Sequence, residues 1–309
     1  MGSLSGSSVL DPALVERIAA DLRSDPSLIE KDWHVVRALG VIANVDTAGM
    51  MPAFSGGTSL SKGWELIKRF SEDIDFKVGE PAASSASRAR RERTAYRHRV
   101  LEALTAENFE LVEKPDVGNE SRFFSADLAY GAEFGAGQGL RPHIRVEMSF
   151  QAPALPPVER PIRSLIVIAQ RQPPEIAAFP CVDPVETAAD KLSALAWRVR
   201  ARDRTKPDDD PTIIRHLHDL AALEQHVASA SRFPELVLAA AAADVGRGGG
   251  APTGDPAVMF AEMLRRLETD PLWAREYEDF VRQVSFAGPE EALDFASALV
   301  ACSRLVSLV

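Results

Sequence analysis

The sequence lacks the features that define several large protein classes. Its only cysteines are Cys181 and Cys302, which exclude a disulfide framework and a four-thiolate zinc site. No apolar run approaches the roughly 18 residues that a membrane-spanning helix needs. Residues 1–8 are small and polar, unlike a secretory signal. Together these absences favour a folded cytoplasmic protein with no membrane segment.

Positive charge is also scarce. The 309 residues include 35 Lys and Arg against 45 Asp and Glu, which gives a formal net charge of -10. This balance excludes a uniformly basic nucleic-acid coat protein, although it permits a local basic groove on an acidic body. The 46% hydrophobic content is ample for a buried core, and the length suits two domains or one domain with a helical extension.

The pattern of apolar residues predicts an α/β first half and a helical second half. Asp11-Pro12 and Asp25-Pro26 each combine an N-cap with a first-turn proline, which predicts helices over 12–24 and 27–43. Further helices are predicted over 58–69, 88–107, 184–201, 211–229, 232–245, 256–268, 271–284 and 289–308. Strands are predicted over 73–78, 108–113, 121–130, 143–150 and 163–170. The expected fold class is α+β, with a small mixed sheet in a first domain (1–180), an all-helical second domain (181–309), and links over 202–210 and 246–254.

The densest chemical signal is the pair of carboxylates Asp73 and Asp75. Side chains two residues apart on a strand point to the same face, about 7 Å apart along the strand. The two carboxylates therefore suit a pair of cations, because two-metal phosphoryl transfer uses carboxylates that bridge ions about 3.5–4 Å apart. The alternative is that both aspartates lie on the solvated face of an edge strand.

A glycine turn precedes these carboxylates. Residues 55–59 (Ser-Gly-Gly-Thr-Ser) open a predicted helix, so backbone N–H groups are left without helical partners where small side chains leave room for phosphates. On its own, a Gly-Gly pair before a helix usually marks a chain turn without a binding function. Followed by a short helix and a carboxylate strand, it matches the layout that a nucleoside triphosphate and magnesium require.

A third carboxylate is expected on a neighbouring strand. Glu147 fits this role, because Ile144, Val146 and Met148 share one face of the strand and Glu147 lies on the other. Asp127, in the preceding predicted strand, is the competing candidate. For Glu147 itself, a surface Arg–Glu ladder is an equally good interpretation.

With these residues assembled, the sequence resembles the AbiEii/AbiGii family of nucleotidyltransferase toxins, which includes the mycobacterial MenT group. The combination of the glycine turn with Ser-x-Asp-x-Asp is the specific part of the match. One departure is that the gap between Gly57 and Asp73 exceeds the tightest polymerase β-type spacing, which agrees with the toxin branch. The matching stretches are residues 30–35, 56–62, 69–76, 190–192 and 218–220.

The resemblance implies a DNA polymerase β-like core and a toxin paired with a cognate antitoxin. The implied reaction transfers nucleotides from an NTP to the 3′ acceptor end of tRNA, which would block aminoacylation and growth. Asp73 and Asp75 would hold two Mg²⁺ ions, with Glu147 as a further ligand. The implied phosphate-binding residues are Gly56, Gly57, Thr58, Lys62, Ser71 and Lys191.

Two later residues, Lys191 and Asp219, have both an ordinary and a functional interpretation. Lys191 flanks the apolar stripe of its predicted helix, as surface lysines commonly do, whereas the resemblance implies a contact with the triphosphate. Asp219 follows Arg215 by four residues, which suits an ordinary helical ion pair, whereas the resemblance implies a catalytic or site-organising role. A zinc site at His216 and His218 is rejected, because residues two apart on a helix do not face each other.

Two arginine-rich segments are candidate nucleic-acid contacts. Residues 88–99 contain six arginines, for which a solvated helix face is an equally good interpretation. The second segment carries Arg198, Arg200 and Arg202 next to the Lys191 helix, and we expect it to contact the tRNA acceptor stem.

Three functions are therefore compared. The first is the magnesium-dependent tRNA nucleotidyltransferase. The second is an enzyme of the same class that modifies a protein or a small molecule, with the arginines serving only solubility. The third is a catalytically silent nucleotide-binding partner protein, which would be free to lose Asp73, Asp75 and Lys191, all of which are present.

Overall fold

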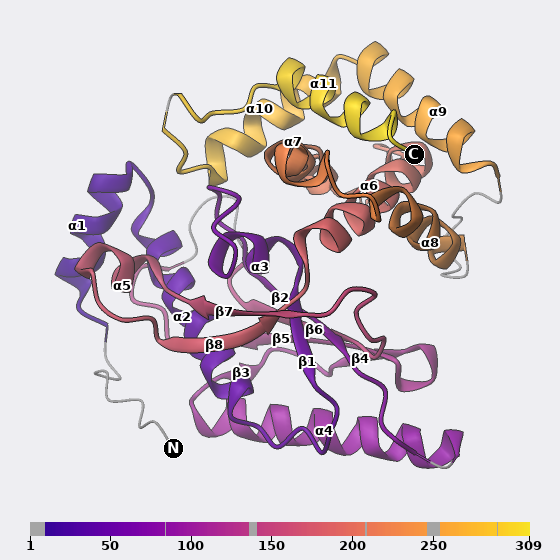
Figure 1. Cartoon of the computed structure of the whole chain (residues 1–309). Coiled ribbons are helices and arrows are strands. Elements are labelled where there is room, and N and C mark those ends of the chain that lie inside the picture. Colours follow the sequence, from indigo (N-terminus) through magenta and orange to yellow (C-terminus); the bar gives the residue numbers. More distant parts are fainter. Residues whose placement is uncertain (1–9, 84, 136–140, 208, 246–253, 289) are drawn as a thin grey trace. The chain divides into compact units, whose positions relative to one another are not determined.

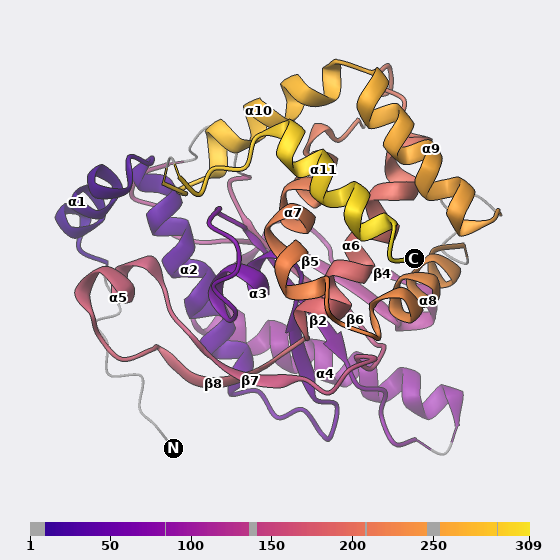
Figure 2. The same cartoon turned by 45° about the horizontal axis from the view of Figure 1, so that its top comes forward.

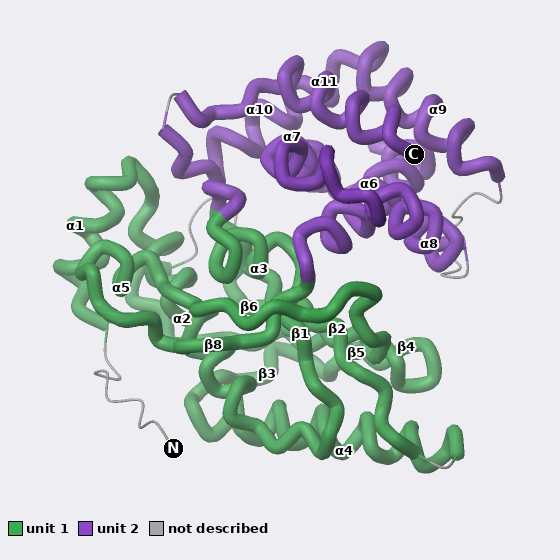
Figure 3. Tube along the Cα trace, viewed as in Figure 1, with its two compact units in different colours: residues 1–65, 70–182 green, residues 66–69, 183–309 purple. Residues whose placement is uncertain are grey.

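The computed structural model describes residues 10–83, 85–135, 141–207, 209–245, 254–288 and 290–309. The chain forms two compact units, shown in Figure 3. Unit 1 comprises residues 1–65 and 70–182, and unit 2 comprises residues 66–69 and 183–309. The sequence placed the division after residue 180 and did not separate residues 66–69. The segment 1–8 and most of the link 246–254 lie outside the described residues.

Unit 1 is built on a mixed sheet (Figure 1) with the strand order β3-β5-β6-β2-β1-β8-β7, and β4 pairs with β5. Strand β2 pairs in parallel with β6 and antiparallel with β1, while β5 pairs antiparallel with β6. The strands are β1 (Pro52–Ser55), β2 (Asp73–Val78), β3 (Glu110–Leu111), β4 (Asp116–Gly118), β5 (Phe123–Ala129), β6 (Ile144–Ser149), β7 (Val158–Ile162) and β8 (Ile176–Cys181).

One face of the sheet carries the core of unit 1. Ile74 and Phe76 of β2 are 0% and 2% exposed, as the period-two pattern of this strand predicts. They form one apolar cluster with residues of β6 and of the helices α2 (Pro26–Ala43) and α4 (Ala86–Ala106). The alternate residues of β2 and β6, which include the carboxylates, therefore point away from this cluster.

Local capping accounts for the first helices. The side chain of Asp11 accepts a hydrogen bond at the start of α1 (Pro12–Leu22), and Asp25 does the same for α2. Both predictions are confirmed. The predicted helix over 58–69 is correct only in its first half, because α3 (Gly56–Lys62) ends early. After it, the Trp64 indole donates to the carbonyl of Val182 and Glu65 adopts a positive φ.

The strand predicted over 163–170 is wrong. These residues form helix α5 (Leu165–Gln170), whose first turn is capped by the Ser164 hydroxyl on the N–H of Val167. The carboxylate of Asp32 also accepts from the N–H of Leu165 at 2.7 Å, so the helix start has partners from two directions. The sheet edge is instead supplied by β7 and β8, which the sequence did not predict as strands.

Unit 2 is helical, as predicted from the sequence. Helix α6 packs against α7, α8 and α9, and α11 lies on α7 and α9, as Figure 2 shows. The segment 66–69 belongs to this unit through the N–H of Phe286, which donates to the carbonyl of Lys68 at 3.0 Å. No helix in the described residues is long and apolar enough to cross a membrane. The helices are α6 (Pro184–Ala201), the 3-10 turn η2 (Pro211–Ile214), α7 (Arg215–Val227), α8 (Phe233–Val245), α9 (Pro256–Thr269), α10 (Leu272–Val284) and α11 (Phe295–Val306).

Candidate active site

The carboxylate site of unit 1 is centred on Asp75. In the sheet register Asp75 is the partner of Ser55 on β1 and of Glu147 on β6. Register partners in neighbouring strands point to the same face of a sheet, and so do Asp73 and Asp75 along β2. The structure thus places Asp73, Asp75 and Glu147 on the face opposite the apolar core.

The competing carboxylate, Asp127, is already engaged. Arg145 donates one hydrogen bond to each of its oxygens, to Oδ1 at 2.7 Å and to Oδ2 at 2.8 Å, and His143 Nε2 lies 3.1 Å from Oδ2. The hydrogen bonds from Arg145 hold the pKa of Asp127 below its usual value. The register places Glu147 beside Asp75, whereas Asp127 is the register partner of Arg145.

The glycine turn touches the Asp75 side chain directly. Gly56 has a φ of +73°, a conformation that L side chains rarely adopt. A Cβ at this position would overlap Asp75 Oδ2 and lie 3.0 Å from Asp75 Cγ. Only glycine therefore allows the turn to lie against the carboxylate, which ties the two sequence motifs to one site.

The other predicted phosphate ligands of unit 1 have various surroundings. The Thr58 hydroxyl, which is fully buried, donates to the backbone carbonyl of Asp73 and so connects α3 to β2. The residue Lys62 is 6% exposed, and its ammonium forms an ion pair with Asp32. Ser71 lies two residues before β2 begins and is therefore outside the strand that carries the carboxylates. The phosphate contact of Lys62 stays a prediction that requires this lysine to leave Asp32.

The sequence did not indicate a role for the charged residues of α2. In the structure two of them contact residues next to the carboxylate site and at the end of α3. Glu30, Lys31 and Asp32 are 1%, 3% and 6% exposed. Lys31 forms an ion pair with Glu72, the neighbour of Asp73, and Asp32 forms one with Lys62 at the end of α3. Burial lowers the pKa of Lys31, an effect that Glu72 opposes. Charged residues on an otherwise apolar helix face are the sequence feature from which such buried partners could have been predicted.

Unit 2 contains a buried ion triad formed by Arg69, Lys191 and Asp219. Arg69 donates from Nε to Oδ1 of Asp219 and from Nη2 to Oδ2, each at 2.7 Å. Lys191 Nζ lies 2.7 Å from Oδ2. The side chains are 4%, 8% and 0% exposed, respectively. Burial opposes ionisation of Asp219, yet the charges of Arg69 and Lys191 hold its pKa well below the usual range. Asp219 thus pairs with these two cations, one of which the sequence did not identify, and His218 Nδ1 lies 3.4 Å from its Oδ1.

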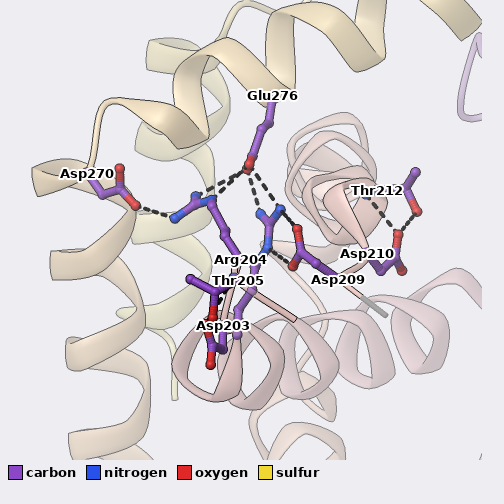
Figure 4. Close-up of polar contacts among 9 residues, drawn as sticks. Asp203, Arg204, Thr205, Asp209, Asp210, Thr212, Asp270 and Glu276 are labelled. Carbon is purple, nitrogen blue, oxygen red and sulfur yellow. Dashed lines mark hydrogen bonds and ion pairs between the residues drawn. The ribbon is translucent and has the colours of Figure 1, made fainter. Parts of the chain in front are cut away.

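The predicted tRNA-binding arginines mostly have carboxylate partners. Arg200 bonds Glu262 at 2.7 Å. The guanidinium of Arg202 contacts Asp209 at 2.7 Å and Glu276 at 2.6 Å, and its side chain is 3% exposed. Figure 4 shows the nearby Arg204, which contacts Glu276 and Asp270. Arg198 and Arg202 both line a cavity of about 290 Å³, together with Trp197, Lys206 and three aspartates.

The oxygen donors of the carboxylate site suit a hard divalent cation such as Mg²⁺. Asp73, Asp75 and Glu147 share one sheet face, but Arg141 Nη1 contacts Asp73 Oδ1 at 2.7 Å. Within the described ranges no three His, Cys, Asp or Glu side chains are gathered closely enough to hold a metal. The donor set therefore fits the ion in kind, and Arg141 shares one of the donors.

Comparisons with known proteins identify the family and the fold of the chain. A family model described as "Nucleotidyl transferase AbiEii toxin, Type IV TA system" matches residues 38–299. Among solved structures, the chain is similar to MenT4, a nucleotidyltransferase toxin from Mycobacterium tuberculosis H37Rv, with 19% identity and a TM-score of 0.51. That match covers 97% of this chain and 88% of the other, and it confirms the predicted α+β nucleotidyltransferase fold. A search of curated proteins found no match. The chain belongs to the AbiEii family of nucleotidyl transferase toxins of type IV toxin–antitoxin systems.

Proposed function

We propose that this toxin is a magnesium-dependent enzyme that adds nucleotides from an NTP to the 3′ acceptor end of tRNA. The observation that carries the proposal is the position of Asp75, against Gly56 on one side and in register with Glu147 on the other. In the reaction the tRNA 3′ oxygen bonds the α-phosphorus, the bond from that phosphorus to the bridging oxygen breaks, and pyrophosphate leaves. The hydroxyl proton passes to solvent water, and the pyrophosphate keeps the electron pair of the broken bond. Blocked acceptor ends would then stop aminoacylation.

The residues of unit 1 would bind and orient the nucleotide. Asp73, Asp75 and Glu147 would hold Mg²⁺, which when bound supplies charge that offsets the negative charge of the phosphates. The backbone N–H groups of Gly56 and Gly57 would contact phosphate oxygens, since small residues allow close approach. Thr58 supports this turn through its bond to the backbone of β2.

In unit 2, Lys191 and Asp219 are proposed as catalytic residues on the family resemblance. A lysine ammonium would offset charge on the leaving pyrophosphate. Asp219 bonds the Lys191 ammonium at 2.7 Å and would hold it in place. A tRNA contact by this unit is proposed for Arg198, Arg200 and Arg202. Arg198 and Arg202 line one cavity with Trp197, whose ring would stack on a base.

The deciding experiment is a labelled-NTP assay with total tRNA and magnesium, with each nucleotide tested separately. We expect label on tRNA from one or more nucleotides with the wild type and none with Asp73→Ala. Label that transfers to tRNA equally with Asp73→Ala would contradict the assignment of Asp73. Growth arrest without any label on tRNA would favour the second candidate, transfer to a protein or a small molecule. Arrest that survives Asp73→Ala unchanged would favour a catalytically silent partner protein.

Replacing Gly56 by alanine is expected to lower the rate of transfer by about a hundredfold, because a displacement of about 1 Å at a reacting group has an effect of this size. The added methyl group would push the Asp75 carboxylate aside. Steady-state kinetics of the labelled-NTP assay would measure the change.

Gly49→Ala is the matched control for this variant. Gly49 also has a positive φ, +85°, but a Cβ there would meet nothing within 4 Å. It therefore carries the same backbone strain without the contact with a carboxylate, and its activity should stay within about twofold of wild type for a strain of about 1 kcal/mol away from the site. Equal losses in the two variants would show that strain, and not the Asp75 contact, explains the effect.

A further inference from the structure

Arg141 lies just before β6 and is anchored through its backbone. Its N–H donates to Glu72 Oε2 at 3.1 Å, and the ammonium of Lys31 donates to its carbonyl at 2.5 Å. Lys31 also pairs with Glu72, so the three residues form a closed set of contacts around the backbone of Arg141. The backbone of Arg141 is thus held independently of where its side chain points.

The side chain of Arg141 is held less firmly. Its guanidinium makes one short contact, to Asp73 Oδ1 at 2.7 Å, and a longer one of 3.8 Å to Glu72 Oε1. It is 34% exposed, whereas the Lys31 side chain is 3% exposed. Ion pairs of exposed groups contribute little free energy, so this contact is easily exchanged for another.

The contact with Asp73 has an electrostatic reason. Asp73, Asp75 and Glu147 lie on one sheet face, and neighbouring carboxylates repel one another without a cation between them. The guanidinium supplies positive charge at an oxygen that a divalent cation would also use. It is equally suited to phosphate, since its planar fork matches phosphate oxygens in a bidentate way.

We propose that the guanidinium of Arg141 pairs with the Asp73 carboxylate when the site holds no metal. When a metal–nucleotide complex binds, the guanidinium leaves Asp73 and contacts the triphosphate. This inference rests on the proposed function, because it assumes that Asp73 binds the metal. Arg141 is then a nucleotide-binding residue, and Lys31 and Glu72 are positioning residues that fix the base of its side chain. The positive charge of the guanidinium weakens binding of the metal ion alone. It strengthens binding of the metal–nucleotide complex, because the triphosphate carries four negative charges.

Arg141→Gln tests the exchange through two binding titrations of opposite expected sign. With Mn²⁺ alone, calorimetry should show binding about threefold to tenfold tighter than wild type, because a competing exposed ion pair has been removed. With the magnesium complex of an α,β-methylene NTP, which cannot be cleaved at the reacting bond, binding should be about tenfold weaker, since a charge-assisted contact with phosphate has been lost.

Two further variants sharpen this test. Arg122→Gln is the matched control, because Arg122 is an exposed arginine of unit 1 that pairs with Glu80 at 2.8 Å, and both of its affinities should equal those of wild type. Arg141→Lys keeps the charge without the planar fork, so its Mn²⁺ affinity should stay near wild type while its nucleotide affinity falls. This variant keeps the test valid if Arg141→Gln does not fold.

The outcomes separate the two proposals. Wild-type protein that binds neither Mn²⁺ nor the nucleotide complex would overturn the proposed function itself. Wild-type protein that binds both, with unchanged or weaker Mn²⁺ binding in Arg141→Gln, would overturn only the exchange of Arg141. Opposite shifts in the two titrations would support it.

Discussion

Asp75→Asn is expected to lower kcat/KM for nucleotidyl transfer by about a thousandfold or more, since charge stabilisation by metal ions amounts to several kcal/mol and each 1.36 kcal/mol is tenfold in rate. Asparagine keeps the shape of the side chain but loses its charge, and Asp75 is the carboxylate that contacts the glycine turn and lies in register with Glu147. The labelled-NTP assay at saturating magnesium measures the loss. Its KM and kcat components show whether binding or chemistry is affected.

The neighbouring carboxylates provide the matched comparison. Glu147→Gln should approach the loss seen in Asp75→Asn, because Glu147 is the register partner of Asp75. Asp127→Asn should retain activity within about threefold, since Asp127 is paired with Arg145, whose side chain is 31% exposed, and is not the register partner of Asp75. A large loss in Asp127→Asn with little change in Glu147→Gln would place the third carboxylate on β5 instead of β6.

Asp219→Asn is expected to destabilise unit 2 by about 3–5 kcal/mol, the usual cost of removing one partner from a buried ion pair. The change leaves two cations, Arg69 and Lys191, in a site where the carboxylate is 0% exposed. Urea unfolding followed by tryptophan fluorescence measures the effect, since Trp197 and Trp273 lie in this unit. The pKa of Asp219 is lowered in the folded state, so its stabilising effect is present above the unfolded pKa of about 3.9 and is lost as the pH falls below it.

Asp279→Asn is the control for this variant. Asp279 also pairs with an arginine of unit 2, Arg282, but the two side chains are 60% and 71% exposed. Its replacement should change the free energy of unfolding by less than about 1 kcal/mol. An Asp219→Asn protein that is as stable as wild type but inactive would show that Asp219 acts in the reaction and is not needed to neutralise the buried cations.

Local physics explains the elements that the sequence predicts well. Asp11 and Asp25 satisfy orphan N–H groups within two residues of themselves, so the starts of α1 and α2 need no distant partner. The alternation along β2 likewise depends only on the period of a strand, which separates Ile74 and Phe76 from the carboxylates. The same reasoning failed at 163–170, because a short apolar run fits a strand and a buried helix equally well.

Charge partners could not be predicted in this way. Arg69 and Asp219 are 150 positions apart, and Arg141 and Asp73 are 68 apart. The sequence shows which charged residues are neighbours along the chain. It does not show which distant residue the fold brings next to a given charged side chain. For the same reason the arginines of 88–99 read as one basic face, although Arg93 and Arg97 are 3% and 6% exposed.

The sequence by itself determined the family, the mixed sheet followed by helices, and the pairing of a glycine turn with Asp73 and Asp75, because these depend on motifs and on the period of each element. Only the tertiary structure decided that Glu147 and not Asp127 is aligned with Asp75 and that Arg202 is enclosed by carboxylates. It also showed that Asp219 holds Arg69 and Lys191 together. These arrangements depend on strand register and on burial, and both are set by contacts between residues far apart in the chain.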